Sequence, residues 1–250
     1  MKEVIVSLKK QIDRSYPIVI EPGLLKQAAE WLVKRFGSHA FAVISDSNIA
    51  GLYAAGLADD LRARGARCKG PFTFPAGEKS KTRRVKSRLE DRMFAAGLGR
   101  DTVVVAVGGG VVGDVAGFVA ATYARGVPLV QVPTTVLAMA DSSVGGKTGV
   151  DVPWGKNLVG AFHQPALVLM DPRTLGTLAP EQFTSGLAEV VKHGVIRDAS
   201  LFEFIENNAS EIVPDNEEIM TELVDRNCWI KAEVVAEDER ESNLRRILNF

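Results

Sequence analysis

Short apolar runs alternate with helical patterns along the first two-thirds of the chain, and this alternation constrains the fold more than any other feature of the sequence. The apolar runs end at Gly, Pro or polar residues, which is typical of buried strands. They cover residues 16–20, 41–45, 102–107, 128–132 and 166–170. Between them, residues 24–36 and 80–96 carry apolar side chains at helical spacing. The pattern predicts an α/β fold with a mainly parallel sheet that helices cover on both faces.

The pattern changes after Pro180. Strand-like runs no longer occur, and helical spacing continues, for example through residues 221–239. The charge changes at the same point, because residues 181–250 contain 16 acidic and 7 basic residues, a net charge of −9, whereas the whole chain has a net charge of −1. We therefore predict two domains, an α/β domain at residues 1–178 and a helical domain at residues 179–250.

The composition excludes several classes of function. A net charge of −1 argues against a dedicated nucleic-acid surface, and the basic run at residues 79–88 has the apolar spacing of a solvated helix face. The most apolar window, residues 102–124, contains Asp114, and a carboxylate in mid-bilayer is too costly for a membrane span. The two cysteines, Cys68 and Cys228, cannot form a disulfide framework, so a reducing cytoplasm is the expected compartment.

A glycine-rich turn follows the predicted strand at residues 102–107 and opens a predicted helix. Gly108, Gly110 and Gly113 have the G-x-G-x-x-G spacing that lets a backbone approach a pyrophosphate at the start of a helix. The acid that ordinary dinucleotide folds place after the next strand is absent, because that strand runs into Thr134. A tight turn with close packing of helix on sheet is the structural alternative.

Residues 141–157, DSSVGGKTGVDVPWGKN, form a second glycine-rich stretch, which we predict to be a long loop. Its GKT tripeptide resembles the end of a phosphate-binding P-loop, but Asp141 stands where that motif needs glycine, so we reject a P-loop. A loop that carries Lys147, Lys156 and Asn157 in a compact domain is more typical of a functional segment than of a solvated connection.

The segment LAEVVKHG places three polar side chains on one face of a predicted helix. Glu189, Lys192 and His193 lie at positions i, i+3 and i+4, which fits a metal site, a proton relay or a solvated flank. Glu189 and His193 have the spacing of two metal ligands on one helix, and a catalytic zinc site would need a further ligand from elsewhere. Of the other histidines, His39 is expected to be structural and the role of His163 stays open.

Four segments together resemble the 3-dehydroquinate synthase family: GGGVVGDVAGFVAATYARG, VPTTVLAMADSSVGGKTGVD, GKNLVGAFHQP and GLAEVVKHG, in this order. The resemblance extends from about residue 40 to Phe250. It implies a Rossmann-like nucleotide-binding domain followed by an all-helical domain. It also implies a lyase that cyclises 3-deoxy-D-arabino-heptulosonate 7-phosphate to 3-dehydroquinate with release of phosphate, a step of the shikimate pathway in aromatic amino acid biosynthesis.

The resemblance implies two cofactors, NAD and a divalent metal ion, either zinc or cobalt. For NAD, the matching positions are Asp46, Asn48, Ala76, Gly77, Glu78, Lys79, Ser80, Lys81, Gly110, Val111, Val112, Gly113, Asp114, Thr134, Thr135, Lys147, Lys156, Thr174, Leu175, Gly176 and Thr177. For the metal ion the matching ligand is Glu189, and His193 receives no ligand role. The family's other two metal ligands are histidines that follow the position of Phe250, so we expect the chain to be part of a longer protein.

The resemblance also implies a phosphorylated sugar acid as substrate. The matching positions for substrate and catalysis are Asp141, Lys147, Asn157, Lys192, Lys231, Arg245, Asn249 and Arg125. The cations among them would hold the carboxylate and the phosphate of the substrate. Arg125 is expected to reach the phosphate, across the interface of a homodimer. No nucleic-acid or membrane partner is expected.

Two other functions remain open at this point. Another sugar-phosphate cyclase, or a metal-dependent polyol dehydrogenase of the same fold, would share the glycine-rich turn. A dehydrogenase would need no phosphate-binding cluster, however, so the lysine-bearing segments count against it. A chain without the two histidines is also consistent with an inactive fragment that binds NAD weakly and zinc poorly.

Overall fold

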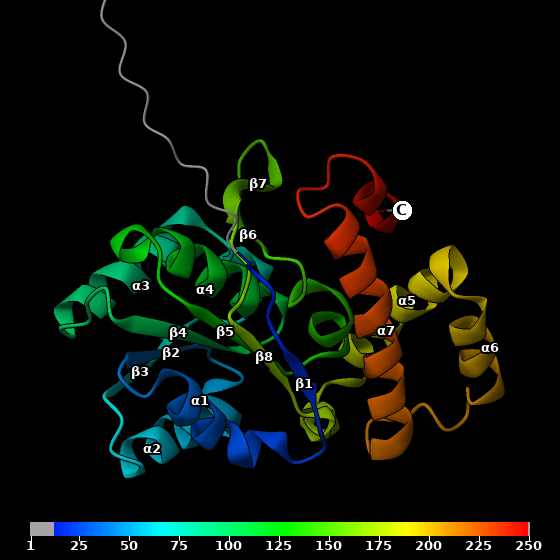
Figure 1. The fold of residues 1–250 in the computed structure, drawn as a ribbon, viewed down its shortest axis with the longest axis horizontal. Helices are drawn as coiled ribbons and strands as arrows, with labels where there is room; N and C mark the ends of the chain where they lie inside the picture. The colour runs from blue at the N-terminus through cyan, green and yellow to red at the C-terminus, as the bar shows by residue number, and fades with distance from the viewer. Residues whose placement is uncertain (1–12, 250) are drawn as a thin grey trace, which may run out of the picture.

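The computed structural model describes residues 13–249 and places six strands in one sheet (Figure 1). The strands are β1 (Ile18–Ile20), β2 (Ala40–Asp46), β3 (Cys68–Phe74), β4 (Thr102–Gly108), β5 (Leu129–Pro133) and β8 (Leu167–Met170). Their order is β1-β8-β5-β4-β2-β3, and neighbouring strands are parallel throughout. The parallel sheet and the five strands predicted from apolar runs are confirmed.

The sequence pattern misses β3. Gly70 and Pro71 interrupt its apolar run, and proline is normally kept out of a sheet because it has no N–H to donate. Strand β3 tolerates Pro71 because it lies at the edge of the sheet and pairs only with β2.

Helices cover both faces of the sheet, as predicted (Figure 1). They are α1 (Ala28–Phe36), α2 (Ala55–Ala63), α3 (Arg83–Ala95) and α4 (Gly110–Thr122). Strand β4 shows how the two layers form, because its side chains alternate between them. Val103 and Val105 pack with α1 and α2, whereas Val104 and Ala106 pack with α3 and α4. All seven residues of β4 are buried, which explains why the strand reads as a continuous apolar run.

The predicted long loop at residues 141–157 is wrong. The segment begins in a helical turn (Ala138–Ser142) and continues as a hairpin of two antiparallel strands, β6 (Lys147–Val152) and β7 (Gly155–Phe162). Glycine makes the hairpin possible, since a Cβ on Gly160 would collide with the carbonyl oxygen of Thr148 on the paired strand. Such close approach of two backbones cannot be inferred from a count of glycines.

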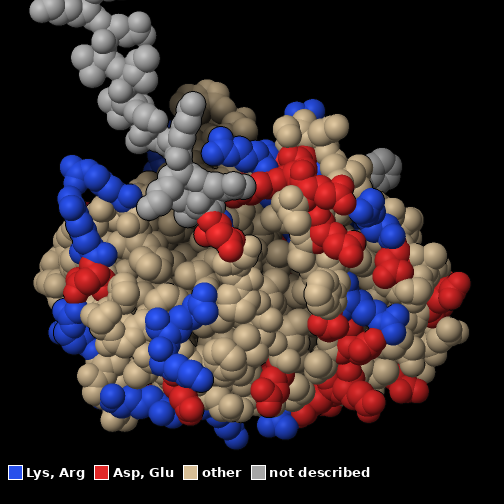
Figure 2. Space-filling view, viewed as in Figure 1, with Lys and Arg blue, Asp and Glu red and all other residues tan. Residues whose placement is uncertain are grey.

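The chain after β8 is helical, as predicted. It forms α5 (Pro180–Arg197), α6 (Ala199–Asn207), α7 (Glu217–Glu237) and a short helical turn (Leu244–Asn249). Asp198 and Asn216 cap α6 and α7 by accepting backbone N–H bonds. Figure 2 shows acidic side chains gathered on the side of the molecule where these helices lie. Within residues 13–249, no helix is long and apolar enough to cross a membrane.

The parallel sheet brings the carboxyl ends of its strands to one edge. Asp46, Gly108, Pro133 and Met170 end β2, β4, β5 and β8, and Thr134 continues from this edge by donating its N–H to the carbonyl of Gly108 at 3.0 Å. In open α/β sheets, ligands bind outside this edge. We refer to it below as the carboxyl edge.

Candidate active site

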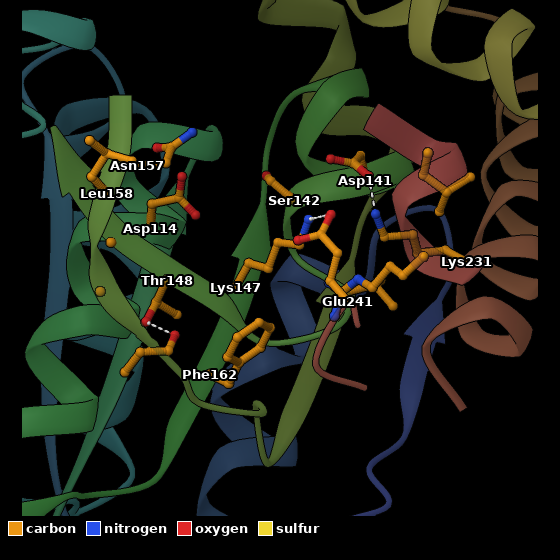
Figure 3. Close-up of a pocket in the computed structure, with 16 residues that line it drawn as sticks. Asp114, Asp141, Ser142, Lys147, Thr148, Asn157, Leu158, Phe162, Lys231 and Glu241 are labelled. Atoms are coloured by element: carbon orange, nitrogen blue, oxygen red, sulfur yellow. Dashed lines mark hydrogen bonds and ion pairs between the residues drawn. The ribbon is translucent and has the colours of Figure 1, made fainter. Parts of the chain in front are cut away.

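A pocket of about 490 Å³ lies between the β6–β7 hairpin and the C-terminal helices (Figure 3). Asp114 of α4 forms one side, together with Asn157 and Leu158 of β7. The other side is formed by Asp141, in the helical turn Ala138–Ser142, and by Lys231 of α7. The full lining comprises Asp114, Asp141, Ser142, Val144, Lys147, Thr148, Gly149, Asn157, Leu158, Gly160, Ala161, Phe162, Lys231, Glu241, Arg245 and Leu248. The structure thus brings five of the predicted substrate residues together: Asp141, Lys147, Asn157, Lys231 and Arg245.

The two lysines of this pocket are paired with acids of the chain itself. Lys147 Nζ lies 2.5 Å from Glu241 Oε1, and Lys231 Nζ forms an ion pair with Asp141 Oδ1 (Figure 3). Burial lowers the pKa of Lys231, and the facing carboxylate of Asp141 opposes this shift. An anionic ligand that binds these lysines therefore has to exchange with Asp141 or Glu241.

Arg245 is 1% exposed and belongs to the wall of the pocket. Its Nη1 donates to the carbonyls of Gly145 and Glu239, each at 2.8 Å, and burial lowers the pKa of the guanidinium. A Cβ on Gly145 would collide with this side chain. In the described residues the Nε atom of Arg245 has no hydrogen-bond partner. Arg245 therefore holds the turn before β6 and also brings an incompletely satisfied cation to the pocket.

Asp114 connects this pocket to the predicted nucleotide site. Its carboxylate lies 2.5 Å from Lys81 Nζ, which is 5% exposed and follows the segment from Ala76 to Ser80. Burial raises the pKa of Asp114 to about 6, even though the charge of Lys81 acts in the opposite direction. The Lys81 carbonyl also accepts the N–H of Asp151 at 2.8 Å, which ties the hairpin to the same segment.

The predicted NAD positions lie along the carboxyl edge. Asp46 Oδ1 accepts the N–H groups of Asn48 and Ile49, at 2.9 and 3.0 Å, and so fixes the turn after β2. The segment Ala76–Lys81 adjoins this turn, since Ala76 N–H donates to Ser47 Oγ at 3.0 Å. The remaining positions occupy the start of α4 (Gly110, Val111, Val112, Gly113, Asp114), the end of β5 (Thr134, Thr135), the hairpin (Lys147, Lys156) and the turn after β8 (Thr174, Leu175, Gly176, Thr177). The carboxyl edge and the separate β6–β7 hairpin therefore carry residues that are far apart in the sequence.

A second cluster of potential ligands borders the pocket. One ligand atom each of Asp141, Glu189 and His193 lies within 4.8 Å of the others. Burial alone would raise the pKa of Glu189, but its interactions with His193 and Lys192 outweigh burial and lower the pKa to about 2. Glu189 is therefore ionised near neutral pH. Two carboxylates and an imidazole are donors that suit zinc or cobalt, so these residues fit a divalent ion.

The hydrogen bonds of His193 define its orientation. Asn227 Nδ2 donates to the Leu223 carbonyl at 2.9 Å, so its Oδ1 is left to accept from His193 Nδ1 at 2.9 Å. The other ring nitrogen, Nε2, lies 3.5 Å from Glu189 Oε1 and lacks a hydrogen-bond partner among the described residues. The shared helix face predicted for Glu189 and His193 is confirmed, whereas a ligand role for His193 stays a hypothesis.

The remaining predicted substrate residues have different surroundings. Lys192 pairs with Glu189 and donates to the Leu248 carbonyl at 2.6 Å. Asn157 has a positive φ of 57° and donates its N–H to Asp151 Oδ1. Arg125 is exposed, has a φ of 74° and does not line the pocket. The side chain of Asn249 and the whole of Phe250 lie outside the described residues.

Two histidines have structural surroundings. His39 precedes β2 and packs edge-on against the ring of Phe36, as expected for a structural residue. His163 Nε2 lies 2.9 Å from the carbonyl of Val127. This contact suits a structural residue, and the role that the sequence left open for His163 stays a hypothesis.

Two residues at the pocket, Glu241 and Phe162, were not predicted from the sequence. Glu241 lies in an acid-rich stretch, where only tertiary structure brings it opposite Lys147. Phe162 is 44% exposed at the end of β7 and lines the pocket. The alternation of the β7 side chains would have been the signal for Phe162, but it requires the segment to be recognised as a strand.

Two family models match consecutive parts of the chain. That of 3-dehydroquinate synthase N-terminal matches residues 71–185, and that of 3-dehydroquinate synthase C-terminal matches residues 186–250. A 3-dehydroquinate synthase of Caldanaerobacter subterraneus subsp. tengcongensis is 48% identical over 250 residues, which are 100% of this chain and 69% of the relative.

The chain belongs to the 3-dehydroquinate synthase family. The resemblance inferred from the sequence is thereby confirmed. A 3-dehydroquinate synthase of Symbiobacterium thermophilum is also 48% identical, over 95% of this chain and 66% of the relative. The chain thus spans about two-thirds of the length of these members of the 3-dehydroquinate synthase family.

Solved structures of related cyclases have the same fold. A 2-epi-5-epi-valiolone synthase from Streptomyces hygroscopicus subsp. jinggangensis, with NAD⁺ and Zn²⁺ bound, has a TM-score of 0.86 and 32% identity, and the match covers 98% of this chain and 68% of that one. A 2-deoxy-scyllo-inosose synthase in complex with carbaglucose-6-phosphate, NAD⁺ and Co²⁺ has a TM-score of 0.84 and 30% identity, over 95% and 65%. A maleylacetate reductase from Agrobacterium tumefaciens, at 21% identity and a TM-score of 0.66, shares the fold alone.

Proposed function

We propose that the chain supplies the NAD-binding domain and the first part of the helical domain of a 3-dehydroquinate synthase. The enzyme would convert 3-deoxy-D-arabino-heptulosonate 7-phosphate to 3-dehydroquinate and phosphate. We place the two domains at residues 1–178 and 179–250. The observation that carries this proposal is the pocket lined by Lys147, Lys231 and Arg245, which borders Asp114 of α4 and the cluster of Asp141, Glu189 and His193.

NAD would bind along the carboxyl edge. Asp46 already uses Oδ1 to cap the turn after β2, so its other carboxylate oxygen is suited to a ribose hydroxyl. The start of α4 offers N–H groups to the pyrophosphate. The NAD⁺ found in both related cyclases supports this assignment.

The divalent ion would be held by Glu189, assisted by ligands from the part of the relatives that this chain does not span. Glu189 remains ionised down to a pH of about 2, as a metal-binding carboxylate requires. When bound, NAD supplies a reversible hydride acceptor and the metal ion lowers the pKa of a substrate hydroxyl. The Zn²⁺ and Co²⁺ of the related cyclases support zinc or cobalt.

The cations of the pocket would bind the substrate. Lys147, Lys231 and Arg245 lie in its wall, and Lys192 lies beside Glu189 at its border. Two anionic groups, a carboxylate and a phosphate, would displace Glu241 and Asp141 from their lysines. Binding of the substrate would thus convert internal ion pairs into contacts with the reactant.

Arg125 and the two cysteines bear on how the protein assembles and where it is found. Arg125 is exposed in an unusual backbone conformation and lies outside the pocket, which suits a role at the active site of a partner subunit in a homodimer. Cys68 and Cys228 are both buried free thiols, in keeping with a reducing cytoplasm.

A different sugar-phosphate cyclase is the second candidate, because the solved cyclases are 30–32% identical to this chain. A polyol dehydrogenase is disfavoured, because an uncharged polyol has no need of four cations around one pocket.

The decisive experiment measures phosphate release from 3-deoxy-D-arabino-heptulosonate 7-phosphate with NAD and Zn²⁺ or Co²⁺ present. It compares this chain with one extended to the full length of the relatives. We expect release from the extended chain only, because the family resemblance places two of the metal ligands in the part of the relatives that this chain does not span. If the extended chain released phosphate from hexose or other heptulose phosphates but not from this substrate, it would be another cyclase. Inactivity on every phosphate, together with NAD-dependent polyol oxidation, would favour the dehydrogenase.

A further inference from the structure

Tyr53 connects two separate parts of the carboxyl edge. It lies in the helical turn Ala50–Ala54, which follows Asp46 and Asn48 at the end of β2. Its hydroxyl oxygen lies 2.7 Å from Thr177 Oγ1 and 3.2 Å from the carbonyl oxygen of Thr174, in the short helix after β8. Strands β2 and β8 are not neighbours, because β4 and β5 lie between them. The side chain therefore spans the sheet from one predicted NAD segment to another.

The hydrogen bonds form a closed group of three oxygen atoms. Thr177 Oγ1 also lies 3.1 Å from the Thr174 carbonyl oxygen, so the three oxygen atoms are in mutual contact. Only two hydroxyl protons, one on Tyr53 and one on Thr177, are available for these three contacts. Because the carbonyl can only accept, one hydroxyl donates to it and the other donates to the first hydroxyl. Both possible arrangements keep the short contact between Tyr53 and Thr177, so the tyrosine fixes a side chain and the backbone of this turn together.

The ring and the hydroxyl of Tyr53 have separable roles. The ring packs against the apolar cluster under α1 and α2, together with Ile49. The turn that carries it is fixed at its start by the carboxylate of Asp46, which accepts the N–H groups of Asn48 and Ile49. One helical turn therefore links the Tyr53 hydroxyl to Asp46 and Asn48, the residues proposed to hold a ribose, so a shift of one would move the other.

We propose that Tyr53 is a positioning residue for NAD. Its hydroxyl holds the turn Thr174–Thr177 at a set distance from Asp46 and Asn48, so that both segments contact one adenosine half at the same time. This inference rests on the proposed function, because it assumes that the carboxyl edge binds NAD. It adds a residue that itself contacts neither the nucleotide nor the substrate.

The test is the Tyr53→Phe variant, which keeps the ring and removes the hydroxyl. Calorimetric titration of the 250-residue chain with NAD, without metal or substrate, should show a Kd about three- to tenfold higher than that of the unchanged chain. Titration with AMP should show a similar factor, whereas nicotinamide mononucleotide should bind to both chains equally.

Tyr123→Phe is the matched control. The Tyr123 hydroxyl also donates to a backbone carbonyl, that of Leu98 at 2.8 Å, but it lies between α3 and α4 rather than at the turn after β8. Removing it should lower the thermal midpoint by at least as much as Tyr53→Phe does, with no change in the Kd for NAD. A purely structural hydroxyl at Tyr53 would behave in the same way as this control, and that result would overturn the proposal.

A double-mutant cycle with Thr177→Val gives a second readout. If Tyr53 acts through Thr177, the double variant should bind NAD no more weakly than the weaker single variant. Additive effects would contradict the coupling. Failure of the unchanged chain to bind NAD would instead refute the proposed function itself, so the two failures are distinguishable.

Discussion

The carboxyl edge and the pocket that contains Lys147, Lys231 and Arg245 differ in what holds their turns and side chains in place. At the edge, turns are fixed by backbone N–H groups, glycines and a few capping side chains such as Asp46. In the pocket, each lysine is held by an acid from elsewhere in the chain, as in the pair of Lys147 with Glu241. A nucleotide therefore meets a surface that is already formed, whereas an anionic substrate has to displace internal carboxylates. The first region is suited to tight binding, and the second is suited to a change of partners during a reaction.

The largest expected effect is that of Gly160→Val in the hairpin. The new side chain would meet the Thr148 carbonyl and the Gly149 backbone, so β6 and β7 cannot stay paired. We expect a loss of about 2–4 kcal/mol in the free energy of unfolding, together with loss of inorganic phosphate binding. Denaturant unfolding and phosphate titration measure the two effects.

Gly56→Ala is the control for this variant, because nothing lies within 4 Å of a Cβ there. It should be neutral or slightly stabilising, since alanine is a better helix former than glycine. The comparison between the two regions predicts that Gly160→Val keeps some affinity for NAD. Parallel loss of NAD and phosphate binding would mean that the edge depends on the hairpin.

Glu189→Gln should separate metal binding from NAD binding. The neutral amide is a poorer ligand, so we expect Co²⁺ to bind at least tenfold more weakly while the Kd for NAD stays unchanged. Glu181→Gln, in the first turn of the same helix, provides the control. Titration calorimetry with Co²⁺ and with NAD gives both constants. An equal effect of the two variants on Co²⁺ binding would remove Glu189 from the metal site.

Asp114 should make the stability of the fold depend on pH. Its pKa is raised from 3.8 in a free side chain to about 6 in the fold, so between these values the folded chain binds more protons than the unfolded chain. The stability contributed by this group is therefore present at low pH and falls as the pH rises from about 4 through about 6. Because the side chain keeps 19% of its surface exposed, we expect a change of about 1–2 kcal/mol.

Asp114→Asn tests this dependence. The variant leaves Lys81 unpaired and thereby costs stability, but its unfolding free energy should vary less with pH between 4 and 6. Urea titrations at several pH values measure the slope for both chains. Identical slopes would show that another group is responsible.

The smallest effect is expected for Lys156→Gln. Lys156 pairs with Glu78 at 3.3 Å, but 74% of its side-chain surface is exposed, so the pair contributes less than about 0.5 kcal/mol to folding. A two- to threefold loss of NAD affinity without a change in the unfolding midpoint would fit the proposed cofactor contact. A measurable loss of stability would instead give the pair a structural role.

Part of the candidate site could be predicted from the sequence, because its residues stand at the ends of predicted strands. Gly108, Thr134 and Asp46 each stand at the end of an apolar run, and in a parallel sheet these ends share one edge. The helix face of Glu189 and His193 follows in the same way from helical spacing. Arg125 shows the limit of this reasoning, because its position relative to a partner subunit depends on an interface.

Local pattern did not predict contacts between distant segments. The hairpin was interpreted as a loop because its glycines resemble a turn, although Gly160 serves the approach of two strands. Tyr53 and Glu241 carry no motif at all. Their partners, Thr177 and Lys147, are 124 and 94 residues away in the sequence, so the roles of both residues depend on packing.

The sequence by itself determined the layers of the fold, the strand ends at which the predicted NAD positions lie and the family to which the chain belongs. These follow from periodicity and from short motifs, which reflect local backbone preferences and the burial of apolar side chains. Tertiary structure alone decided which charges from distant segments meet. An ion pair such as Lys231 with Asp141 forms between side chains 90 residues apart, and its existence depends on how α7 packs against the turn before β6.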